Sequence, residues 1–148
     1  MNIKDKENIA EYNVWSCGRY SHNLDGFQIS AGTEGTVTTN ENGIKILRTT
    51  TNDTYFYPFV FITVNSEDIG KNITIKCSCK GAGNIESRCL KSDWSTANAT
   101  SVNVPSNCSE IICTNELVQG TARVQFRFTL PRTANSILYL NNITITIQ

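Results

Sequence analysis

The chain has 148 residues, and its 13 Lys and Arg balance its 13 Asp and Glu. This length corresponds to one domain, and the lack of a basic excess argues against nucleic-acid binding, which needs positive charge to neutralise phosphates. The longest apolar run, 59–62, is far shorter than the ~18 residues of a membrane-spanning helix. The first residues contain no apolar segment typical of a secretion signal. We therefore expect a soluble protein that is made in the cytoplasm without secretion and does not insert into a membrane.

Residues 1–23 are charged or weakly patterned, and we expect them to form a lead-in segment that packs on or near the rest of the chain. After residue 23, β-favouring runs alternate with turn signals rich in Asn, Gly and Pro. The predicted strands are 27–30, 36–39, 44–50, 55–64, 73–80, 85–91, 110–114, 123–130 and 137–147. The polar segment 93–109 is predicted to be a long surface loop.

The run 55–62 divides its residues between the two faces of a strand. If Phe56, Val60 and Ile62 face the core, the opposite face presents four aromatic rings, those of Tyr55, Tyr57, Phe59 and Phe61. Such a stripe suits stacking on sugars or contact with a protein, and a third interpretation buries the strand on both sides.

Cysteines are found at positions 17, 77, 79, 89, 108 and 113. In the run 73–80, Cys77 and Cys79 share a face with Ile73 and Ile75, which indicates small buried thiols. Disulfides and a zinc site remain alternatives, although the C-x-C spacing differs from the C-x2-C spacing of structural zinc sites.

Trp94 lies in the predicted loop between polar neighbours, where it is either a ligand platform or an anchor for its own loop. Further along, Val124, Phe126 and Phe128 alternate with polar residues that include Gln125 and Arg127. One apolar face per strand predicts an all-β, antiparallel β-sandwich of two sheets with about four or five strands each. Gln125 and Arg127, with Arg123, would then face outward and supply polar contacts to a ligand.

Four short motifs occur in an order that resembles jelly-roll carbohydrate-binding modules of the grouped families 4, 9 and 22. They are Leu24-Asp25-Gly26-Phe27-Gln28-Ile29, Asn42-Gly43-Ile44-Lys45-Ile46, Ile69-Gly70-Lys71-Asn72-Ile73-Thr74-Ile75 and Leu138-Tyr139-Leu140-Asn141-Asn142-Ile143-Thr144-Ile145. The resemblance covers residues 24–148 and implies a galactose-binding-like jelly roll that binds glycans or polysaccharides. Similar domains recur in bacteriophage tail, fibre and head-decoration proteins.

Many proteins of this group hold a structural calcium, partly through an acidic residue of the closing strand. Here Asn141 and Asn142 offer no carboxylate, and calcium prefers several charged oxygens. We therefore expect no cofactor or metal, and a structural calcium is the less favoured alternative.

Residues that could support catalysis are few. His22 lies near Asp25, but no Ser or Cys is evidently positioned as a nucleophile beside them. Glu86 and Glu116 are carboxylates near predicted strands or loops, and we interpret both as solvated surface charges. The chain is thus predicted to be a recognition module and not an enzyme.

The sequence predicts glycan binding through Tyr55, Tyr57, Phe59, Phe61, Trp94, Gln125 and Arg127. We expect the module to be part of a phage virion or tail, or to act at a cell surface after assembly. The alternative is a structural virion protein that uses the same aromatic stripe to contact virion proteins or other copies of itself in a homo-oligomer.

Overall fold

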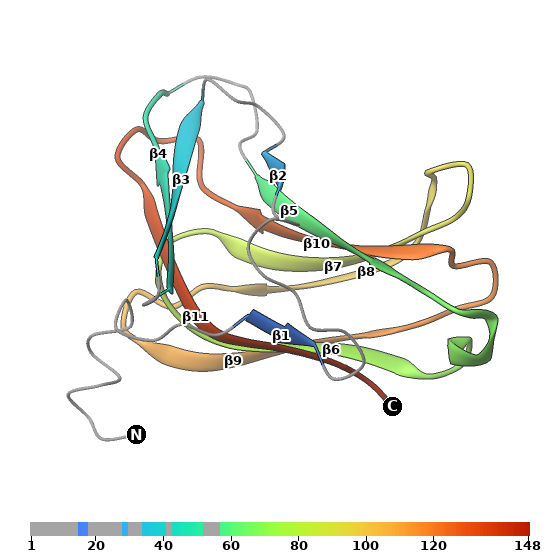
Figure 1. Cartoon of the computed structure of the whole chain (residues 1–148). Helices are drawn as coiled ribbons and strands as arrows, with labels where there is room; N and C mark the ends of the chain where they lie inside the picture. Colours follow the sequence, from blue (N-terminus) through green and yellow to red (C-terminus); the bar gives the residue numbers. More distant parts are fainter. Residues whose placement is uncertain (1–14, 18–27, 30–33, 41–42, 52–56) are drawn as a thin grey trace.

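A computed structural model of the chain describes residues 15–17, 28–29, 34–40, 43–51 and 57–148 (Figure 1). These residues form a β-sandwich, with one short 3-10 turn, η3 (Ser66–Asp68). The strands are β1 (Trp15–Cys17), β2 (Gln28–Ile29), β3 (Gly35–Asn40), β4 (Gly43–Arg48), β5 (Pro58–Thr63), β6 (Asn72–Gly81), β7 (Asn84–Leu90), β8 (Thr96–Asn103), β9 (Ser109–Glu116), β10 (Arg123–Thr129) and β11 (Ile137–Ile147). The predicted all-β jelly-roll class is confirmed.

Within these ranges the strands form a six-stranded and a five-stranded sheet. The six-stranded sheet has the order β3-β4-β11-β6-β9, with β1 also paired to β11, and the five-stranded sheet has the order β2-β5-β10-β7-β8. Figure 1 shows the two sheets packed as layers, with long connections passing from one layer to the other. The five-stranded sheet agrees with the predicted four or five strands, and the other sheet holds one strand more.

The edges of the sheets account for this difference. Strand β1 pairs in parallel with β11, with Trp15 opposite Ile143, whereas all pairing was predicted to be antiparallel. β1 comes from the segment predicted as a lead-in, and its backbone is part of the six-stranded sheet.

The prediction of a continuous loop over 93–109 was wrong, because β8 lies within it and pairs antiparallel with β7. The sequence of β8 has no apolar face, so it lacks the alternation typical of a strand. Its polar side chains instead bond to β9 of the other sheet. The Thr100 hydroxyl donates to the Thr114 carbonyl at 2.9 Å, and the Asn98 amide donates to Asn115 Oδ1 at 2.7 Å.

The core lies between the two sheets and is built from the inward residues of each strand. Val124, Phe126 and Phe128 of β10 are fully buried, as their alternation predicted. Ile143 and Ile145 of β11 are buried as well. The same alternation leaves the other side of each strand facing outward.

Four cysteines belong to this core as free, buried thiols: Cys77, Cys79, Cys89 and Cys113. The interpretation of Cys77 and Cys79 as small buried residues of β6 is confirmed. Burial raises the pKa of the Cys89 and Cys113 thiols above the ordinary value. Cys17 lies in β1, but its side chain is outside the described part of the structure.

No helix in the described part of the chain is long and apolar enough to cross a membrane.

Candidate ligand-binding face

The outward side of the five-stranded sheet gathers the aromatic and arginine residues that the sequence singled out. On β5, Val60 and Ile62 point into the core and are almost fully buried, so Phe59 and Phe61 point outward, where they are half-buried. We call this side the outer face. It is formed by Tyr57, Phe59, Phe61, Asn84, Glu86, Arg88, Arg123, Gln125, Arg127 and Thr129.

Four rings form a continuous line along this face, which we call the aromatic ladder. The ring centroids of Tyr57 and Phe59 are 6.0 Å apart, and those of Phe59 and Phe61 are 5.2 Å apart. Trp94 extends the line, with its ring centroid 5.7 Å from that of Phe61 in an edge-to-face arrangement. These spacings are typical of favourable aromatic pairs, so each ring limits the movement of the next.

Trp94 reaches the ladder from the hairpin between β7 and β8. The hairpin is closed by backbone bonds from Lys91 to Ser95 and from Trp94 to Lys91. The Asp93 carboxylate accepts bonds from the Ser95 hydroxyl and backbone N–H, and these bonds lower the pKa of Asp93. The guanidinium of Arg123 lies 3.9 Å from the Trp94 ring centroid.

The Trp94 side chain is nevertheless 59 % exposed. It therefore makes contacts within the protein and also presents ring surface to solvent, so both interpretations of this residue are compatible with its position.

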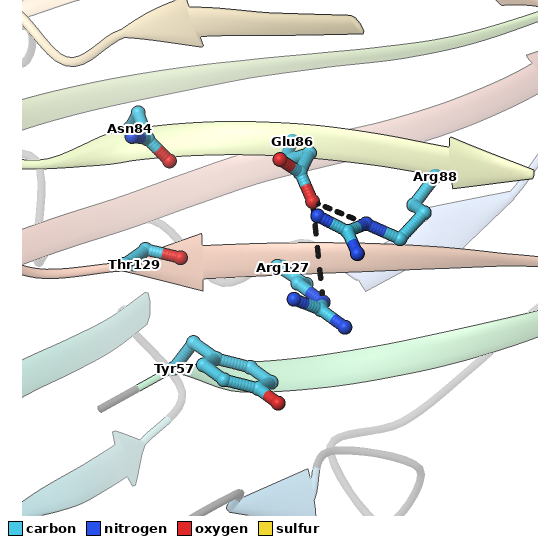
Figure 2. A pocket seen from close by; sticks show the side chains of 6 residues that line it. All are labelled: Tyr57, Asn84, Glu86, Arg88, Arg127 and Thr129. Atoms are coloured by element: carbon cyan, nitrogen blue, oxygen red, sulfur yellow. Dashed lines mark hydrogen bonds and ion pairs between the residues drawn. The ribbon is translucent and has the colours of Figure 1, made fainter. Parts of the chain in front are cut away.

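A polar cluster lies beside the tyrosine end of the ladder (Figure 2). Arg88 Nε donates to Glu86 Oε1 at 2.7 Å, and Arg127 Nε is 4.0 Å from the same oxygen. Arg127 Nε also donates to Gln125 Oε1 at 2.7 Å, while its guanidinium lies 4.4 Å from the Tyr57 ring centroid. Burial, and then the like charge of Arg88, lower the pKa of Arg127 below its ordinary value.

The face is hollowed at this end. A pocket of about 320 Å³ is lined by Tyr57, Asn84, Glu86, Arg88, Arg127 and Thr129, and we call it the Tyr57 pocket. A second hollow of about 360 Å³ adjoins it, with Asn84 and Thr129 in both linings. Since Arg123 and Thr129 are the two ends of β10, Trp94 and the Tyr57 pocket lie at opposite ends of the outer face.

The structure therefore brings Tyr57, Phe59, Phe61 and Arg127 together on the outer face, with Trp94 at its end. Gln125 lies on the same side of β10 but is buried, 5 % exposed, against the prediction that it contacts a ligand. Tyr55, the seventh predicted ligand residue, and its neighbour Phe56 lie outside the described residues. The interpretation of Glu86 as a solvated charge was wrong, because its side chain is 23 % exposed and paired with Arg88.

Arg88 was not singled out from the sequence. The sequence feature that could have identified it is the alternation of Asn84, Glu86 and Arg88 with the buried Ile85 and Cys89 along β7. Glu116, by contrast, is exposed at the end of β9.

The part of β11 that contains Asn141 and Asn142, where related modules can hold calcium through an acidic residue, forms a β-bulge. Pairing with β6 shifts between Asn141 and Thr144, and Asn142 has a φ of 52°. Asn141 is buried at this bulge. Over the described ranges, no three His, Cys, Asp or Glu side chains are grouped closely enough to hold a metal ion. His22 and Asp25 lie outside these ranges.

No protein-family model and no curated protein matches the chain. Solved structures do match in fold. A CBM4 carbohydrate-binding module aligns with 18 % identity over 85 % of this chain and 89 % of its own, with a TM-score of 0.62. The CBM22-1 xylan-binding domain of Paenibacillus barcinonensis Xyn10C aligns with 12 % identity over 95 % and 91 % of the two chains, with a TM-score of 0.58.

Tailspike protein 4 of bacteriophage CBA120 contains a similar domain. It aligns with 15 % identity and a TM-score of 0.69 over 85 % of this chain, which corresponds to 20 % of the tailspike chain. At these identities the comparisons establish a shared fold, the jelly roll of carbohydrate-binding modules.

Proposed function

We propose that this chain is a non-catalytic carbohydrate-binding module whose ligand lies along the outer face. The observation that carries the proposal is the aromatic ladder beside a row of polar side chains. Apolar rings on an outward strand face are not needed to fill the core, and an apolar stripe with a polar border is typical of an interaction site.

The chemistry of the face suits a sugar chain. Sugar rings stack their C–H faces on aromatic rings, and Tyr57, Phe59 and Phe61 offer three in succession. Sugar hydroxyls need hydrogen-bond partners, and Arg127 supplies donors on the neighbouring strand, where the buried Gln125 accepts a bond from its Nε. Since the ladder and the polar row run along adjacent strands, a single extended ligand can contact both.

The fold comparisons support binding of glycans, because proteins with this fold include modules named for carbohydrate and xylan binding. The charges of the outer face support binding without catalysis. Glycoside hydrolysis generally uses two carboxyl groups, and Glu86 is the one carboxylate on the described part of the outer face. That carboxylate is held in an ion pair with Arg88.

Within this proposal, we place the module in a phage virion or tail, acting in attachment to glycans of the host surface. The similar domain in a phage tailspike favours that setting. The alternative is a structural virion protein, in which the aromatic ladder contacts other protein subunits.

The test is the double variant Tyr57→Ala/Phe59→Ala on a glycan array. Loss of two stacking rings is expected to reduce retention by about tenfold or more, while the far-UV spectrum and the core remain unchanged. Tyr139→Ala is the matched control, because this tyrosine belongs to β11 of the other sheet and contacts Lys80 there.

Light scattering on the same proteins separates the two roles. A monomer that retains glycans supports the binding module. A defined oligomer that dissociates in the double variant, with no retention of any glycan by the unchanged protein, would instead support the structural role.

A further inference from the structure

We propose that the Tyr57 pocket binds the carboxylate of an acidic sugar, so that the glycans bound by this chain contain uronic acid residues. This inference rests on the proposed function and names its ligand class. It is carried by two arginines that face one hollow beside an aromatic ring.

The two arginines are held in place by their Nε atoms. Arg88 uses Nε to donate to Glu86, and Arg127 uses Nε to donate to Gln125. Within the described part of the chain, the terminal Nη atoms of both donate no hydrogen bond to the protein. Figure 2 shows both guanidinium groups between Glu86 and Tyr57, at the hollow that these residues line. Each arginine is thus oriented, with its donor-rich end directed at the pocket.

The charges of the pocket are unequal. Its lining contains two arginines and one carboxylate, so it has an excess of one positive charge. The side chains of Arg88 and Arg127 are only 28 % and 23 % exposed, so water screens their mutual repulsion incompletely. The lowered pKa of Arg127 has the same two causes, burial and the proximity of Arg88. An anion between the guanidinium groups would offset this repulsion.

The remaining lining residues indicate that the anion belongs to a sugar. A planar guanidinium matches a carboxylate with two parallel hydrogen bonds. The Tyr57 ring provides a surface for stacking the sugar that carries the carboxylate, and the side chains of Asn84 and Thr129 can bond its hydroxyls. The pocket volume of about 320 Å³ suits one sugar residue, while the aromatic ladder continues along β5 for the rest of the chain.

The experiment compares acidic oligosaccharides with neutral counterparts that differ only at the carboxyl group. Tetragalacturonate is paired with its full methyl ester, and a glucuronic-acid-substituted xylo-oligosaccharide is paired with its carboxyl-reduced form. Titration calorimetry at constant ionic strength is expected to show about tenfold tighter binding of at least one acidic member over its neutral partner, as charge-assisted hydrogen bonds provide.

Three variants locate the effect. Arg127→Gln and Arg88→Gln should each remove most of the preference for the acidic member, measured as the ratio of its affinity to that of its neutral partner. Lys76→Gln is the control, because it removes one positive charge from β6 on the opposite side of the sandwich, where Lys76 pairs with Glu110. If Arg127→Gln does not fold by circular dichroism, Arg88→Gln provides the same test.

The outcomes separate this inference from the proposed function. Equal affinity for acidic and neutral members would overturn the acidic-sugar assignment and leave glycan binding intact. If no oligosaccharide or array glycan binds, both fail. If Lys76→Gln loses the preference for the acidic member as fully as Arg127→Gln does, the preference comes from the overall charge of the protein, and the assignment to the Tyr57 pocket is overturned. Tighter binding of a sulfated dextran than of every uronate would assign the pocket to sulfate and overturn the carboxylate.

Discussion

The two outward sides of this sandwich differ in what they present, although both belong to strands with the same alternating pattern. On the six-stranded sheet, most outward residues of β6 and β9 are polar, and the apolar exception, Ile112, is 55 % exposed. Lys76 and Glu110 form an ion pair at 3.7 Å with side chains that are 52 % and 57 % exposed, and the hydroxyls of Thr74 and Thr114 are 3.0 Å apart. Such exposed contacts suit a solvent-facing surface and contribute little to the free energy of unfolding.

On the five-stranded sheet, the equivalent positions hold half-buried rings and arginines. Phe61 contacts its ring neighbours, and Arg127 is packed over Tyr57. Both sheets bury their inward side chains in one shared core, so the aromatic residues on the outer face are not required to complete it. The comparison teaches that the shared core is built from inward residues, and that the residues of the outer face are available for recognition.

The largest expected effect tests this division within one sheet. Phe126→Ala removes a fully buried ring of β10 and should lower the free energy of unfolding by about 3–5 kcal/mol. Phe61→Ala removes an outward ring of β5 and should lower it by about 1 kcal/mol. Urea denaturation of both variants measures the difference. Equal losses would mean that the aromatic ladder is part of the core, and the division between the two faces would not hold.

The second comparison concerns the turn that supports the Tyr57 pocket. Gly83 has a φ of 97°, and a Cβ atom there would overlap the carbonyl oxygen of Thr129, which lines the pocket. Gly120 has a similar φ of 92° but open space around it. Gly83→Ala should cost about 2–3 kcal/mol, because strain is combined with a displaced backbone, and Gly120→Ala about 1 kcal/mol.

Thermal unfolding of the two glycine variants provides this measurement. Oligosaccharide affinity is a second measurement. Gly83→Ala is expected to change it and Gly120→Ala is not, since only the change at Gly83 alters the lining of the Tyr57 pocket. If Gly120→Ala is as destabilising as Gly83→Ala, backbone conformation alone accounts for both effects and the close approach of Thr129 contributes nothing.

Most of the fold could be predicted from the sequence because the strand period is strongly marked in the centre of each sheet. Phe126 and Phe128 alternate with polar residues so regularly that their burial follows directly. Edge strands carry a weaker signal. The stretch Thr96–Asn103 contains small and polar residues without an apolar face, and its pairing depends on β7 and on side-chain bonds to β9.

Site residues that lie on a single strand could be predicted from the sequence. Site residues that different strands bring together could not, because their position depends on the strand order. Tyr57, Phe59 and Phe61 lie two residues apart, so their common side follows from geometry alone. The role of Arg88 requires the strand order β5-β10-β7, which places Glu86 directly opposite Arg127. Since β7 and β10 are distant in the sequence and their register is set by the folded sheet, the shared pocket could not be derived from residue spacing.

The smallest expected effect concerns the hairpin that carries Trp94 at the far end of the outer face. The bonds from Ser95 lower the pKa of the Asp93 carboxyl below its ordinary value of 3.8. Asp93 therefore adds stability that is fully present above pH 3.8 and is lost as the pH falls through the lower pKa of the folded state. The melting-temperature difference between the unchanged protein and Asp93→Asn should be smaller than for any variant above.

This difference should grow as the pH rises from below the folded-state pKa to about 3.8 and then stay nearly constant, because Asp93 is charged in both states at higher pH. Differential scanning calorimetry of the two proteins over that range checks the prediction, and subtraction removes the contribution of the other carboxyl groups. A difference that is independent of pH would show that the Asp93 charge does not hold the hairpin. Trp94 would then be positioned by its contacts with Phe61 and Arg123, so the far end of the outer face would depend on the ladder itself.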